Sequence, residues 1–125
     1  MFAKRLDDDT YEIDEVYLER RVGSIAFVKL YNNHRYKRFQ ARYHKKHKFD
    51  YRKHNYIGDW HSHPSFECVP SGFDMMEVEM DMQESNADFL IQVILKVERN
   101  LLVGNAFLYN NEVSAKRIEL EIEQL

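Results

Sequence analysis

Apolar and polar residues alternate in short runs along most of the chain, a pattern typical of β-strands separated by turns. The clearest run is residues 88–97, D-F-L-I-Q-V-I-L-K-V, which is nearly all apolar, as a buried central strand should be. Residues 1–6 and 11–19 should pair as a hairpin, with Met1 beside residues 16–19. The full set of further strands that we predict is 1–6, 11–19, 24–31, 101–109 and 115–122, with turns at 7–10 and 110–111.

Residues 34–54 are strongly basic, with nine of the eighteen Lys and Arg residues against one acid, Asp50. The first part, H-R-Y-K-R-F-Q, alternates like a strand, whereas residues 41–53 could form a short helix. The segment is either a solvated cover for a sheet face or a contact surface for an acidic partner. Interleaved Tyr and Phe keep nucleic acid open as that partner, but no known nucleic-acid motif is present and we do not favour it.

Histidines also gather in this basic segment, where they imitate a metal cluster. His44 and His47 are three apart and would share a helix face. Because so many cations surround them, we expect the four to be exposed and rank them behind His61 and His63. The four are His34, His44, His47 and His54.

Residues 74–84, D-M-M-E-V-E-M-D-M-Q-E, fit two patterns. Their apolar side chains alternate as in a strand, but Met, Glu and Gln are good helix formers. Ser71 followed three residues later by Asp74 is typical of a capped helix start, with Ser71 as the N-cap. We therefore predict a helix, whose Met side chains pack adaptably in the core.

The candidate chemistry lies in residues 58–74, G-D-W-H-S-H-P-S-F-E-C-V-P-S-G-F-D. Residues 56–60 are aromatic and β-branched enough to form a strand, and residues two apart on a strand point to the same face. His61 and His63 can therefore aim at one point. Asp74 would add a carboxylate from the helix start, and two imidazoles, one carboxylate and one open position form the ligand set of a catalytic zinc site. Alone, an H-x-H pair is weak evidence, and capping alone would explain Ser71 and Asp74.

The spacing H-S-H, seven residues, then S-x-x-D matches the JAMM motif of the MPN/JAB metalloproteases without a mismatch. The chain resembles the compact prokaryotic JAB proteins of that family. The resemblance implies an α/β (mixed α+β) fold related to the cytidine deaminases, with a mixed central sheet flanked by helices. It also implies that His61, His63 and Asp74 hold one Zn²⁺ with water as the fourth ligand, and that Ser71 donates a hydrogen bond to the oxyanion.

The substrates implied by the resemblance are ubiquitin-like proteins or their conjugates, cut at an amide or isopeptide bond after the modifier's tail. The family's general-base Glu is not found. The chain opens like the tail of the strand that this Glu normally precedes, so we expect the Glu to lie a few residues upstream of Met1 and the first helix of the family to be absent or cut short. Glu15 and Glu19 are internal alternatives, and a partner could also donate the base.

Without its base, the chain could instead be a non-catalytic scaffold that keeps zinc and acts through interfaces. A deaminase fits poorly, because the P-C-x-x-C ligands of zinc deaminases are missing. Cys68 lies in the loop beside the site. It is either a loop thiol without a role at the metal or a fourth zinc ligand that displaces the water and keeps the enzyme inactive.

Length and composition add limits. At 125 residues we expect a single domain, 1–125, that is short at its N-terminus. The hydrophobic fraction of 44% excludes a disordered chain, and no apolar run is long enough for a membrane span or fits a signal peptide. The single cysteine excludes an internal disulfide framework and fits a reducing, cytoplasmic setting.

Overall fold

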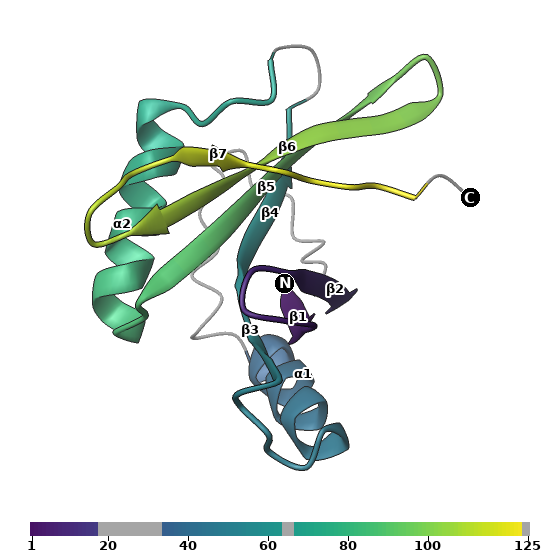
Figure 1. Ribbon diagram of the computed structural model, residues 1–125, viewed down its shortest axis with the longest axis vertical. Coiled ribbons are helices and arrows are strands. Elements are labelled where there is room, and N and C mark those ends of the chain that lie inside the picture. The colour runs from purple at the N-terminus through teal and green to yellow at the C-terminus, as the bar shows by residue number, and fades with distance from the viewer. Residues whose placement is uncertain (18–33, 64–66, 124–125) are drawn as a thin grey trace. The chain divides into compact units, whose positions relative to one another are not determined.

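The computed structural model describes residues 1–17, 34–63 and 67–123 (Figure 1). Contacts divide the chain into two compact units, Met1–Tyr56 and Ile57–Leu125, and each contains its own sheet. The fold is mixed α/β, with two helices and two sheets in the described ranges, as the sequence predicted. The single domain over 1–125 stays a prediction. Neither helix combines the length and apolar character needed to cross a membrane.

The sheet of the first unit has three antiparallel strands. β1 (Phe2–Arg5) lies between β2 (Tyr11–Glu15) and β3 (His54–Tyr56). The predicted hairpin is confirmed, and Phe2 lies opposite Glu15, a register that agrees with the expected pairing of Met1 with residues 16–19. The strand predicted at 24–31 lies outside the described residues.

The helix α1 (His34–Lys46) corrects two predictions. Residues 34–40 are helical despite their strand-like alternation, because Tyr36, Phe39 and Tyr43 recur at helical spacing and pack around the fully buried Phe2. The ring centroid of Phe2 lies 4.7 Å from that of Tyr43 and 5.6 Å from that of Phe39. The helix predicted over 41–53 is confirmed for residues 41–46, but its extension to residue 53 is wrong. The backbone turns at Lys48 and Phe49, whose φ angles of 55° and 58° are left-handed.

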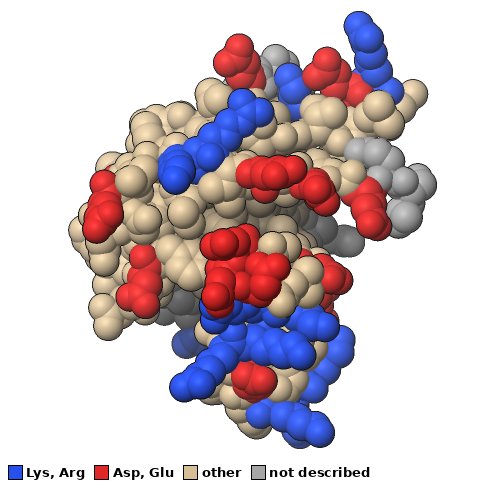
Figure 2. Space-filling view, viewed as in Figure 1, with Lys and Arg blue, Asp and Glu red and all other residues tan. Residues whose placement is uncertain are grey.

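The basic segment presents its charges to solvent and buries its histidines in part. All nine Lys and Arg residues of 34–54 are exposed. On the face drawn in Figure 2, Lys and Arg side chains gather in the region that Figure 1 labels α1. His34 is exposed as predicted, but His44, His47 and His54 are half-buried. That expectation of exposure was wrong because these rings pack against one another and against Tyr43.

The sheet of the second unit has the order β4-β5-β6-β7. Its strands are β4 (Gly58–Ser62), β5 (Phe89–Glu98), β6 (Leu101–Asn110) and β7 (Lys116–Ile118). β4 runs parallel to β5, so the chain needs a crossover between them, and α2 (Gly72–Ser85) lies in that connection. β5 is an interior strand, as its apolar run predicted, whereas the strand predicted at 115–122 is reduced to three residues.

The strand predicted at 56–60 is divided at Ile57. Tyr56 pairs with Phe2 in the first sheet, and Gly58 pairs with Ile91 in the second. Only glycine fits at this start of β4. Gly58 has φ of 152°, and a Cβ added there would lie 1.7 Å from the carbonyl oxygen of Ile91. The missing side chain therefore lets β4, which carries His61, approach β5.

The helix α2 confirms the capped helix predicted after the histidines. Val78 and Met82, four residues apart, are buried, and α2 contacts β5. Met76 and Met80 are 48% and 47% exposed, so the prediction that the Met side chains pack in the core holds only in part. The apparent strand pattern mixed two faces of a helix, of which only one is covered.

Candidate metal centre

The two histidines converge as the strand geometry predicted. His61 is in β4, opposite Ile94 of β5. The backbone N–H of His63 donates to the carbonyl of Leu95 at 2.9 Å, so β4 keeps its extended hydrogen bonding one residue past its end. Both rings therefore lie on one face of the strand, and their Nε2 atoms are 3.0 Å apart.

A carbonyl fixes which nitrogen of His63 can bind a metal. Nδ1 of His63 lies 2.9 Å from the carbonyl oxygen of Glu67. A carbonyl only accepts, so Nδ1 carries the proton and donates. In the neutral ring the lone pair is then on Nε2, the atom that points at His61. Metal-ligating histidines commonly hold their second nitrogen in this way.

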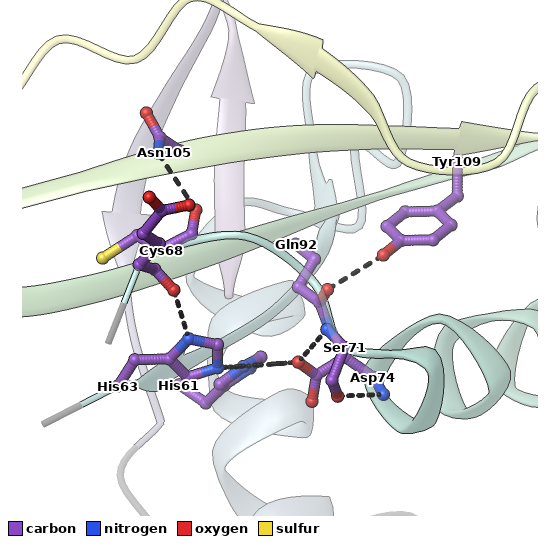
Figure 3. Close-up of polar contacts among 9 residues, drawn as sticks. His61, His63, Cys68, Ser71, Asp74, Gln92, Asn105 and Tyr109 are labelled. Atoms are coloured by element: carbon purple, nitrogen blue, oxygen red, sulfur yellow. Dashed lines mark hydrogen bonds and ion pairs between the residues drawn. The ribbon is translucent and has the colours of Figure 1, made fainter. Parts of the chain in front are cut away.

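Asp74 reaches the histidines from the first turn of α2 (Figure 3). Its Oδ2 is 3.4 Å from Nε2 of His61 and 3.5 Å from Nε2 of His63. A capping box holds the carboxylate there. The backbone N–H of Ser71 donates to Oδ2 at 2.8 Å, and the backbone N–H of Asp74 donates to Oγ of Ser71 at 3.1 Å.

These atoms fit a tetrahedral zinc ion. With Zn–N and Zn–O bonds of about 2.0–2.1 Å, two ligands of a tetrahedral site lie about 3.3 Å apart. The three separations between His61, His63 and Asp74 are 3.0, 3.4 and 3.5 Å. Two neutral imidazoles and one carboxylate are also the donor set that zinc takes when a fourth position stays open.

Burial and neighbouring groups act in opposite directions on Asp74. Burial favours the neutral acid, but the hydrogen bond from the Ser71 backbone and the nearby His61 and His63 outweigh it, so the pKa of Asp74 lies below its ordinary value. The carboxylate is therefore ionised near neutral pH, the state that a metal requires.

Two further carboxyl groups surround the site and were missed from the sequence. Burial, then the charges of Asp59 and Asp74, raise the pKa of Glu77 to about 7. Burial also raises the pKa of Asp59, against the opposing effects of His61 and Gln92. The signal for Glu77 was available, since it lies three residues after Asp74 on a predicted helix. Asp59 could have been found at i−2 from His61 on the same strand face.

Ser71 and Cys68 lie beside the cluster in different ways. Ser71 is exposed at the helix start, and its hydroxyl contacts the backbone of Asp74. Cys68 is buried, and its carbonyl oxygen accepts a hydrogen bond from Nδ2 of Asn105 at 3.0 Å. Figure 3 shows its sulfur pointing away from the histidines, and its thiol is not part of the group that could hold a metal.

The internal candidates for the missing base are Glu15 and Glu19. Glu15 belongs to β2 of the first unit, where a carboxylate oxygen lies 3.8 Å from Nζ of Lys46. Glu19 lies outside the described residues. Within the described ranges, no glutamate joins the group formed by His61, His63 and Asp74.

Comparison with known families identifies the family of the chain. The family model for prokaryotic homologs of the JAB domain matches residues 4–108, well over half of the chain. The chain therefore belongs to the prokaryotic JAB domain family. No curated protein and no solved structure matches it.

Proposed function

We propose that the chain is a zinc-dependent isopeptidase or peptidase that cuts an amide bond after the tail of a ubiquitin-like protein. The observation that carries the proposal is the group of His61, His63 and Asp74, whose ligand atoms have the separations of a tetrahedral zinc site in a JAB family member. When bound there, Zn²⁺ would polarise the scissile carbonyl and lower the pKa of a water in the open position.

The protein's own groups hold the metal ligands in position and supply a hydrogen-bond donor for the reaction. His63 is held by the Glu67 carbonyl and Asp74 by the Ser71 backbone, so both present their ligand atoms without reorganisation. Ser71 has a second task. Its Oγ accepts a hydrogen bond from the Asp74 backbone, and a hydroxyl that accepts one bond keeps its own proton to donate. We assign that proton to the oxyanion that develops when water attacks the amide.

A non-catalytic zinc-binding scaffold is the second candidate, and a specific observation favours it. The general-base Glu of the family is not found in the sequence, and no glutamate in the described part of the chain joins the metal group. A positioned base typically contributes roughly 10²–10⁴ in rate. Glu77 is a candidate substitute three residues after Asp74 on the same helix, and its raised pKa suits proton transfer near neutral pH.

The test measures zinc and turnover together. Purified chain should bind zinc at this site and cleave an isopeptide-linked ubiquitin-like substrate, and His61→Ala/His63→Ala should lose the zinc of this site together with the cleavage. An unchanged zinc content in this variant would show that His61 and His63 are not zinc ligands. Zinc without cleavage would favour the scaffold, and cleavage that survives the loss of this zinc would exclude a zinc hydrolase.

Ser71 can be separated from its capping role by a matched pair of variants. Ser71→Ala loses both cap and donor, whereas glycine is a nearly adequate N-cap without a hydroxyl, costing only a few tenths of a kcal/mol. If Ser71 stabilises the oxyanion, Ser71→Ala and Ser71→Gly should both lose roughly 10²–10³ in kcat. If kcat instead falls only in the less stable Ser71→Ala variant and stays near wild type in Ser71→Gly, Ser71 acts only as a helix cap.

The basic surface over α1 suits an acidic partner, and the substrate is the natural one. Residues 34–54 carry nine exposed Lys and Arg side chains and only one acid, Asp50. Charge reversal in Arg38→Glu/Arg42→Glu should therefore raise KM, most strongly at low salt, while kcat stays the same. Arg117→Glu on β7 is the control, and an equal effect there would point to net charge alone. A cytoplasmic location stays a prediction.

A further inference from the structure

A second group of metal-ligand atoms lies in the first unit, where neither the JAMM motif nor the family resemblance places a metal. Asp14 is in β2, His47 follows the last residue of α1, and His54 begins β3. The ligand atoms of the three residues all lie within 4.8 Å of one another. Their side chains are only 22%, 18% and 14% exposed, respectively.

The ordinary pairings of these groups do not explain the arrangement. Nε2 of His47 is 3.8 Å from Oδ2 of Asp14, and Nδ1 of His54 is 3.6 Å from the same oxygen. Both separations are too long for a hydrogen bond, even for a charged pair. Both nitrogens are buried and have no hydrogen-bond partner among the described residues. Buried polar atoms without partners are rare and need an explanation.

We propose that Asp14, His47 and His54 bind a second divalent metal ion, Zn²⁺. Two buried imidazole nitrogens close to one carboxylate oxygen are typical of ligands that share a metal, and a bound metal would satisfy the nitrogens that have no hydrogen bond. The two separations between Asp14 and the histidines exceed the ideal tetrahedral value of about 3.3 Å by only a few tenths of an ångström. Nitrogen and oxygen donors without a thiolate also favour zinc over Cu(I).

The two imidazoles must turn for the metal to bind. Their rings are stacked, with centroids 3.7 Å apart and planes 10° from parallel, so their lone pairs do not yet meet at one point. Rotation of an imidazole about its Cβ–Cγ bond is a soft torsion and opens the stack. Asp14 is already held, because Oδ2 accepts a hydrogen bond from the hydroxyl of Tyr43 at 3.4 Å.

Such an ion would join three elements of the first unit that are far apart in sequence. It would connect the hairpin strand β2 to the end of α1 and to the start of β3. Among the described residues of this unit, Phe2, Tyr36 and Tyr43 are the buried members of the apolar cluster, and none of them makes a hydrogen bond to Nε2 of His47 or Nδ1 of His54. A metal that binds only the folded unit stabilises it by mass action, so its role here is structural.

The experiment counts zinc in four full-length proteins after dialysis, by elemental analysis. Wild type should retain about two zinc ions, His61→Ala/His63→Ala about one, His47→Gln/His54→Gln about one, and the fourfold variant none. The His61→Ala/His63→Ala protein has an unaltered second site, so its zinc content requires no mutant of the first unit to fold. If that protein is folded and holds no zinc, the second site does not exist.

Spectroscopy identifies the ligands in the same background. Co²⁺ added to the His61→Ala/His63→Ala protein should give the visible absorption of a four-coordinate site, and Zn²⁺ should raise its Tm. Asp14→Asn, which keeps the size of the side chain, should abolish both signals. His44→Gln is the matched control, because His44 is half-buried in the same segment but is outside the metal group. Signals that persist in Asp14→Asn, or that vanish equally in His44→Gln, would overturn the assignment.

Discussion

The double use of Asp74 leads to a prediction that separates metal binding from helix capping. Oδ2 of Asp74 accepts the Ser71 N–H at 2.8 Å and also lies 3.4 and 3.5 Å from the two histidine nitrogens. Asp74→Asn keeps the shape and an acceptor oxygen for the cap but removes the charge. Ser71→Ala removes the other bond of the capping box and leaves the carboxylate in place.

The two changes should cost similar stability without metal. Replacing a carboxylate by an amide exchanges a charged hydrogen bond for a neutral one, a loss of about 1 kcal/mol, and weakens the charge–dipole interaction at the helix N-terminus by about 0.3–1 kcal/mol. Ser71→Ala should cost about 1 kcal/mol for the lost N-cap. The Asp74 side chain is only 14% exposed, so little of its contribution is lost to solvent screening.

Their effects on zinc should differ sharply. Loss of a partner outside the ligand shell already weakens a metal site by about 10–100-fold, so loss of a ligand in Asp74→Asn should cost more than about 100-fold. Ser71→Ala should change the zinc affinity by less than about tenfold, because the Ser71 backbone still holds Oδ2.

The assay pairs urea unfolding in EDTA with zinc competition against a chelator. The zinc measurements use an Asp14→Asn background, which removes zinc binding at the proposed second site, so that the measured affinity is that of the site with Asp74. A zinc affinity of Asp74→Asn within about tenfold of that of the protein with Asp74 would refute Asp74 as a ligand. Zinc loss in Ser71→Ala as large as in Asp74→Asn would show that capping, rather than ligation, governs the site.

Three other predictions follow. Because the pKa of Asp74 is lowered by folding, its ionisation stabilises the folded state above the ordinary Asp pKa of about 3.9 and this contribution is lost as the pH falls through the folded value. The difference in metal-free unfolding free energy between wild type and Asp74→Asn should therefore shrink below about pH 4, and a constant difference would contradict the shift. Gly58→Ala should destabilise the chain by at least about 2 kcal/mol in urea unfolding, because its Cβ would meet the Ile91 carbonyl; a wild-type midpoint would show that β4 can move away. Cys68→Ser should leave zinc content and turnover unchanged, since its thiol is not part of the metal group, whereas a faster variant would mean that the thiolate binds the metal and inhibits.

Local chemistry is the part of this protein that the sequence determined alone. The S-x-x-D cap set the start of α2, and the H-x-H spacing put two imidazoles on one strand face, because both depend on residues within a single turn or strand. The nearly continuous apolar run of residues 88–97 identified the interior strand β5 for the same reason.

The tertiary structure decided everything that depends on which face is covered. Residues 34–40 fit both periods, and packing of Tyr36, Phe39 and Tyr43 around Phe2 selected the helix. In α2 the contact with β5 is accompanied by burial of Val78 and Met82, while Met76 and Met80 stay in solvent.

Long-range convergence is likewise invisible in a linear pattern. Asp14 is more than thirty residues from His47 in the chain, and only the packing of β2, α1 and β3 brings it to His47 and His54. The basic composition of residues 34–54 suggested exposed histidines, but composition averages over a segment, whereas burial is set residue by residue by what packs against each side chain.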